Sequence, residues 1–202
     1  MILADVFSAV SVWILVIKIA SLPPLSFRLM PAAVKNLKGS FDMYFLLHPF
    51  FENCRRPVIM GVGSELRNDD GAGVLLSHML SERFSDKNVT VITGGTAPEN
   101  FTGEIKKASP DVLFIVDAAF MNLPVGSVKV LNPSSVGGIS FSTHMLPLPL
   151  TLDYLRAECD CKTVLIGIQP YNTEQGLEIC EEVRLSVEKL VQAFEQNIAE
   201  MS

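Results

Sequence analysis

Short apolar runs rich in β-branched residues alternate along most of the chain with longer segments of helical spacing. From residue 57 onward, the pattern predicts strands at residues 58–61, 89–93, 112–116, 126–131 and 163–168, and helices at residues 72–83, 100–108, 147–158 and 178–197. A short lead-in helix is expected at residues 44–54. This order is typical of a three-layer α/β fold, in which helices cover both faces of a mostly parallel, twisted sheet of about five strands.

The first 42 residues follow a different pattern. Residues 6–17 form an uncharged run of 12 residues, which is shorter than the ~20 that a membrane-spanning helix needs. Asp5 stands where a signal peptide would carry basic residues, and Pro23 and Pro24 would end any helix. We expect residues 1–42 to be an N-terminal extension, either a misassigned start upstream of Met43 or a weak membrane anchor. Residues 43–202 are expected to form the functional domain.

Composition narrows the class of protein. The chain has 202 residues, of which 49% are hydrophobic, and this suits one globular domain. Its net charge of −6 argues against nucleic acid as a partner. The four cysteines are too few and too irregular for a disulfide framework, so we expect reduced thiols and a cytoplasmic protein. Membrane contact is expected only through residues 1–42.

Polar residues follow several of the predicted strands. The segment after the first strand, residues 61–73, reads GVGSELRNDDGAG and leads into a helix. The carboxyl ends of parallel strands meet at one edge of a sheet, where α/β folds bind ligands. The residues that this topology brings to the edge are Asp69, Asp70, Gly94, Gly95, Thr96, Asp117, His144 and Gln169.

Each acid also has a structural interpretation. Two adjacent aspartates cannot both cap the following helix, so one of Asp69 and Asp70 is expected to be the cap and the other is free to face a ligand. Asp117 directly follows five apolar strand residues, and its alternative role is to bond loop amides. His144 is either a ligand or a surface residue of its loop. His48 and His78 are interpreted as structural or solvated.

Two carboxylates and one imidazole suit a divalent transition metal with open coordination positions, such as nickel or zinc. The chain lacks the HExxH helix of zinc proteases and the GxSxG turn of serine hydrolases. Its GxG is not followed by the third glycine of a dinucleotide-binding loop, and the acids after it would repel a pyrophosphate. The residues alone therefore favour metal-assisted chemistry at the sheet edge.

Five segments resemble the maturation endopeptidases of nickel-iron hydrogenases, and most closely the hydrogenase-3 type. They are GVGSELRNDDGAG at residues 61–73, GGTAPEN at 94–100, FIVDA at 114–118, STHM at 142–145 and LIGIQP at 165–170. The similarity covers residues 57–195, and one departure is Ser64, where the family usually has asparagine.

The resemblance implies removal of a C-terminal extension from a hydrogenase large-subunit precursor after nickel insertion, which activates the hydrogenase. It implies Asp70, Asp117 and His144 as metal ligands, Asp70 and Asp117 as catalytic acids, and Gly94, Gly95 and Thr96 as lining of the substrate cleft. With Asp70 as a ligand, Asp69 is the expected helix cap. Nickel would arrive with the precursor, so no tightly bound metal is expected in the free enzyme. The loop glycines are expected to let that precursor come close.

Two other functions fit parts of the pattern. A non-catalytic α/β module that binds a metal or a nucleotide would retain a tight ligand and release no peptide. A small esterase would use His144 as a base oriented by Asp117, and would hydrolyse simple esters without nickel.

Overall fold

The computed structural model describes residues 40–84, 89–131, 140–141 and 161–201. The predicted extension before Met43 therefore lies almost entirely outside the described residues, as do His144 and the helix predicted at 147–158. The first described helix, α2 (Ser40–Phe51), begins three residues before Met43. Within the described part of the chain, no helix is both long enough and apolar enough to cross a membrane.

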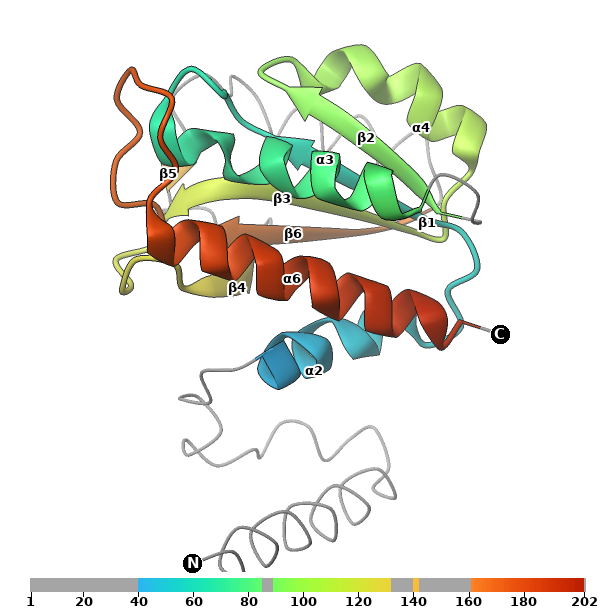
Figure 1. Cartoon of the computed structure of the whole chain (residues 1–202). Coiled ribbons are helices and arrows are strands. Elements are labelled where there is room, and N and C mark those ends of the chain that lie inside the picture. The colour runs from blue at the N-terminus through green and yellow to red at the C-terminus, as the bar shows by residue number, and fades with distance from the viewer. Residues whose placement is uncertain (1–39, 85–88, 132–139, 142–160, 202) are drawn as a thin grey trace, which may run out of the picture. The chain divides into compact units, whose positions relative to one another are not determined.

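A mostly parallel sheet forms the centre of the domain (Figure 1). Its strand order is β2-β1-β3-β6-β4, with bounds Thr90–Gly95, Pro57–Val62, Val112–Phe120, Lys162–Ile168 and Val128–Leu131. The first four of these strands run parallel, and β4 pairs antiparallel with β6. A two-residue strand, β5 (Ser140–Phe141), pairs antiparallel with the end of β3. These pairings confirm the predicted fold class.

Helices cover both faces of the sheet. One apolar cluster joins the inward side chains of α2, α3 (Ala72–Arg83) and α6 (Glu181–Ala199) to residues of β3 and β6 such as Phe114 and Ile166. The other face packs against α4 (Thr102–Ala108) through Ile105, which contacts a cluster that includes Leu113 and Ile115. Alternate residues of β3 thus enter opposite clusters, because successive strand side chains point to opposite faces. Burial on both faces explains why this strand is apolar throughout.

Several element bounds differ from the sequence prediction, and two of the differences affect the site. Strand β3 continues to Phe120, so Asp117 lies inside the strand and not at its end. Helix α6 begins at Glu181, because backbone amides of the preceding loop are bonded to the side chains of Asn68 and Asp69. The helix predicted at residues 100–108 is a 3-10 turn, η4 (Pro98–Phe101), followed by the shorter α4.

Candidate active site

The first loop delivers two acids to the carboxyl edge of the sheet. After β1, the chain turns at Gly63, whose φ is +132°, and enters a 3-10 turn, η3 (Asn68–Gly71), that leads directly into α3. Asp69 and Asp70 both lie in this turn and are each only 1% exposed. Two adjacent acids are therefore buried where α/β folds place their ligands.

One oxygen of the Asp70 carboxylate is committed to its own loop. Oδ2 accepts a hydrogen bond from the Ser64 amide at 3.0 Å, and the Arg67 Nε lies 4.0 Å from the same oxygen. Oδ1 is buried and has no hydrogen-bond partner among the described residues. Residue 64 acts here through its backbone amide, so serine in place of asparagine leaves this contact available.

Asp117 is the second buried acid of the site. It lies on β3 opposite Gly167 of β6, is fully buried, and neither carboxylate oxygen accepts a hydrogen bond within the described ranges. Burial raises the pKa of Asp117 well above its ordinary value, and the neighbouring Asp70 charge raises it further. The backbone amide of Ala118 lowers the pKa but does not offset the rise.

Close backbone packing brings the two acids together. A methyl group added at Gly63 would lie 1.8 Å from the backbone oxygen of Asp70 and 3.8 Å from Oδ1 of Asp117. Only glycine lets the backbone at residue 63 lie this close to the backbone of Asp70. The result is three buried carboxylate oxygens without a protein partner in the described structure. Such a donor set fits a divalent cation or a shared proton.

Asp69 does not cap a helix, so that prediction was wrong. Neither η3 nor α3 has a side-chain capping bond at its N-terminus. Instead, Oδ2 of Asp69 accepts bonds from the amides of Tyr171 and Asn172 at 2.8 and 3.1 Å, and Oδ1 accepts one from Cys180 at 2.7 Å. Asp69 therefore joins the first loop to the loop between β6 and α6.

The glycines of the first loop pack against the chain itself. A methyl group at Gly61 would lie 1.9 Å from the Gly73 oxygen, and one at Gly73 would lie 2.3 Å from the oxygens of Val62 and Val116. The expectation that these glycines leave room for a substrate was wrong, because backbone atoms already fill the space. Their role is to let α3 begin directly against β1 and β3.

The predicted cleft residues lie beside the first loop. The Gly95 oxygen accepts a hydrogen bond from the Gly63 amide at 3.0 Å, which joins the end of β2 to the loop. Gly94 is buried against Met60, whereas Thr96 is exposed. A methyl group at Gly95 would meet nothing within 4 Å, so there is open space at this position. The structure thus brings these three residues to the edge that carries the acids.

The histidine of the predicted site, His144, lies outside the described residues. Among the residues that the structure describes, no three His, Cys, Asp or Glu side chains form a metal-binding group. His78 is half exposed on α3 and lies 3.8 Å from Glu65, in agreement with a solvated role. Cys54 and Cys180 are free thiols, as the composition predicted.

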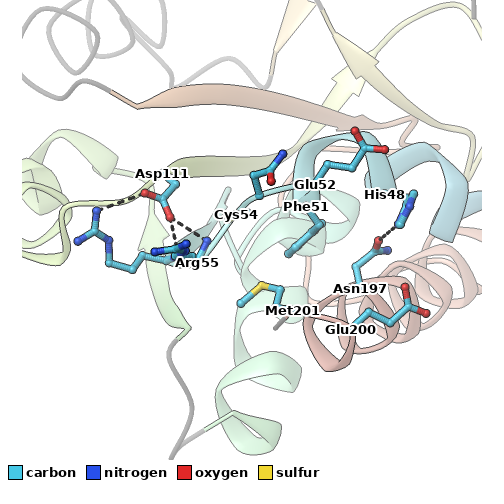
Figure 2. Close-up of a pocket in the computed structure, with 11 residues that line it drawn as sticks. His48, Phe51, Glu52, Cys54, Arg55, Asp111, Asn197, Glu200 and Met201 are labelled. Atoms are coloured by element: carbon cyan, nitrogen blue, oxygen red, sulfur yellow. Dashed lines mark hydrogen bonds and ion pairs between the residues drawn. The ribbon is translucent and has the colours of Figure 1, made fainter. Parts of the chain in front are cut away.

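A polar pocket of about 700 Å³ lies at the other end of the sheet, next to the start of β1 and β3 (Figure 2). Several of its polar side chains are bonded to one another or to the backbone. Asp111 accepts bonds from the amides of Arg55 and Arg56, and His48 is bonded to Asn197. Parallel sheets bind ligands at their carboxyl edge, so the acid pair is the better candidate.

Sequence reasoning missed the contacts that support Asp70 and Asp69. The partners of Asp69 are 102–111 residues away in sequence, and no local sequence pattern indicates them. Gln169, which the topology placed at this edge, has a comparable function. Its Oε1 accepts bonds from the amides of Met121 and Leu123 at 2.7 and 3.3 Å and so holds the loop that follows β3.

Known proteins are similar to this chain in sequence and in fold. Residues 74–197 match the sequence profile of the family described as hydrogenase maturation protease. The chain is 36% identical over 157 residues to a Methanocaldococcus jannaschii protein whose name assigns it to these proteases, covering 74% of this chain and 92% of that protein. It is 32% identical over 139 residues to the hydrogenase 3 maturation protease of Escherichia coli strain K12, covering 68% and 88%.

Solved structures agree. The crystal structure of a NiFe hydrogenase maturation protease from Thermococcus kodakarensis KOD1 superimposes with a TM-score of 0.71 at 30% identity. The match covers 76% of this chain and 99% of that one. The chain belongs to the hydrogenase maturation protease family, and it is a peptidase that processes hydrogenase.

Proposed function

We propose that the chain is an endopeptidase that removes a C-terminal extension from the large-subunit precursor of a nickel-iron hydrogenase after nickel has been inserted. One observation carries this proposal. Asp70 and Asp117 are buried together at the carboxyl edge of the sheet, and three of their oxygens have no partner among the described residues. Buried carboxylates are costly to leave in this state unless a ligand or a reaction uses them.

The metal in this proposal belongs to the substrate. Carboxylate oxygens of Asp70 and Asp117, together with the imidazole of His144, would contact nickel that the precursor already carries. A bound metal ion of this kind polarises a peptide carbonyl. Recognition through the metal would explain discrimination against a precursor that has not received nickel.

The two acids differ in ways that suit hydrolysis. Asp117 has a raised pKa, because it is buried and lies near a second negative charge, so it is the better acceptor for a proton from water. Asp70 is oriented by the Ser64 amide, which leaves Oδ1 directed to the site. Gly94, Gly95 and Thr96 would line the approach, and a Cβ added at Gly95 would meet no atom of the described residues within 4 Å.

The direct test mixes the purified, chelator-treated chain with nickel-loaded and nickel-free large-subunit precursor. Mass spectrometry then follows the loss of the C-terminal peptide. We expect cleavage of the nickel-loaded precursor alone. Equal cleavage of both forms would contradict recognition through nickel, and cleavage of neither form would contradict the endopeptidase.

Substituting Asp70, with a second aspartate as control, distinguishes a catalytic role of the acid pair from a general effect of removing a negative charge. Asp70→Asn is expected to lower the cleavage rate about 100-fold or more, which is the usual scale for a lost acid–base group. The matched control is Asp111→Asn, because Asp111 directly precedes β3, the strand that carries Asp117, at the end opposite the acid pair. Normal processing by the Asp70→Asn variant, with nickel-loaded precursor, would show that Asp70 is not part of the machinery.

A further inference from the structure

We infer that an apolar rim around the acid pair is the docking surface for the hydrogenase precursor, an inference that rests on the proposed function. Seven large hydrophobic residues are exposed in the described part of the chain, and five of them lie at or after the carboxyl ends of β1, β3 and β6. These five, which we name the apolar rim, are Leu66, Phe120, Leu123, Tyr171 and Leu177, with 36–77% of their surface exposed.

The two loops that carry most of the rim are bonded directly to each other. Figure 1 shows the loop between β6 and α6 beside the segment that leads into α3. The Leu66 oxygen accepts a bond from the Gly176 amide at 2.9 Å, and Gly176 in turn accepts one from the Asn68 amide at 3.0 Å. Arg67 and Gly176 form an isolated β-bridge between the two loops. Leu66 and Leu177 are each next in sequence to one of these two residues.

Buried polar side chains hold the rim in place. Asp69 accepts three amides, two of which belong to Tyr171 and Asn172, and it is 1% exposed. Gln169 accepts the Leu123 amide and is 6% exposed. The loop between β6 and α6 and the loop after β3 are thus ordered before a partner arrives, which lowers the entropic cost of binding. Apolar side chains presented on ordered loops beside a reactive centre are typical of a recognition surface.

The position and charge of the rim identify its occupant. Asp69 and Asp70 are adjacent in the chain, so a protein seated on the rim would present its chain to Asp70 and Asp117. Glu65, Glu174 and Glu178 are exposed on the same two loops, whereas their single basic residue, Arg67, lies 4.0 Å from Asp70. The surface that fits is an apolar patch of the precursor bordered by lysine or arginine.

The experiment uses the double variant Leu66→Ser/Leu177→Ser of the full chain with nickel-loaded precursor. We expect KM for the precursor to rise about tenfold with kcat unchanged, because two truncated interface contacts, each worth about a factor of three, multiply. Phe45→Ser is the control, since Phe45 is also an exposed large hydrophobic residue but lies on α2, away from the rim. It should leave both constants unchanged.

Binding is measured separately in the Asp70→Asn background, in which the precursor is not cleaved. The double substitution should weaken precursor affinity about tenfold, and added salt should weaken binding to the unsubstituted rim. Unchanged KM and affinity in the double variant would overturn the docking surface while leaving the endopeptidase intact. If the double variant loses affinity for the precursor but the wild-type chain cleaves no precursor, the docking surface is supported and the endopeptidase is refuted.

Discussion

Replacing Asp117 with asparagine is expected to stabilise the chain in the same step that removes its activity. Asp117 is fully buried and neither of its oxygens has a hydrogen-bond partner in the described residues, so the fold gains little from the charge. Burial and the Asp70 charge raise its pKa. An acid whose pKa is higher in the folded than in the unfolded chain destabilises the fold at any pH above the unfolded value.

The size of the effect follows from that linkage. An aspartate has an unfolded pKa of about 3.9, and each unit of rise costs ~1.4 kcal/mol, so at pH 7 a raised pKa can cost the fold at most ~4 kcal/mol. Asparagine removes the charge, but its buried amide without partners costs ~1–3 kcal/mol, which offsets part of the gain. We expect a net stabilisation of at most about 2 kcal/mol, which corresponds to a rise in Tm of at most about 4–8 °C for a chain of this size.

Thermal melts of chelator-treated wild type and Asp117→Asn at pH 5 to 8 measure the difference. The gain should increase with pH, because wild-type stability falls as pH rises from the unfolded toward the folded pKa. Asp111→Asn is the matched control, and it is expected to change Tm in the opposite direction. Amides of Arg55 and Arg56 lower the pKa of Asp111, so its ionised form favours folding and the substitution should lower Tm. An Asp117→Asn chain that melts at or below wild type throughout would refute the reasoning.

Two further predictions concern packing and thiol chemistry. Gly73→Ala should lower the free energy of unfolding by about 3 kcal/mol in urea titrations, because its methyl group would lie 2.3 Å from two backbone oxygens. Gly103→Ala in α4 meets nothing within 4 Å and should be neutral or stabilising, and equal losses in both variants would contradict the packing argument. Burial raises the pKa of the Cys54 thiol to about 11, so its alkylation by iodoacetamide, followed by mass spectrometry against pH, should reach half its maximal rate near that value. A midpoint near 9, as expected for an exposed thiol, would contradict this.

The fold could be predicted because its signals are local. Five apolar residues at 112–116 indicate a strand buried on both faces, and the helical spacing of Val183, Val187 and Val191 indicates the closing helix. The sequence predicts too short a strand at β3, because an aspartate after five apolar residues indicates the end of a strand. The residues after it, Ala118 to Phe120, remain apolar and continue the pairing with β6 and β5.

The site could be predicted in part. Parallel topology was enough to bring Asp70 and Asp117 to one edge, since both follow from strand direction. The role of Asp69 could not be predicted, because its partners are backbone amides of a distant loop. The packing role of Gly61 and Gly73 was missed for a related reason. A glycine next to open space and a glycine against backbone look alike in a sequence.

The long sequence separation of the Asp69 contacts has a consequence for a chain that is still being synthesised. The amides that Asp69 accepts follow it by 102, 103 and 111 residues, and the last belongs to the residue just before α6. A nascent chain that has already formed β1 and α3 lacks these partners, and closing so long a loop is slow. We expect the acid pair to reach its final arrangement only after Cys180 has been synthesised, so that a protease interrupted before that residue has no working site.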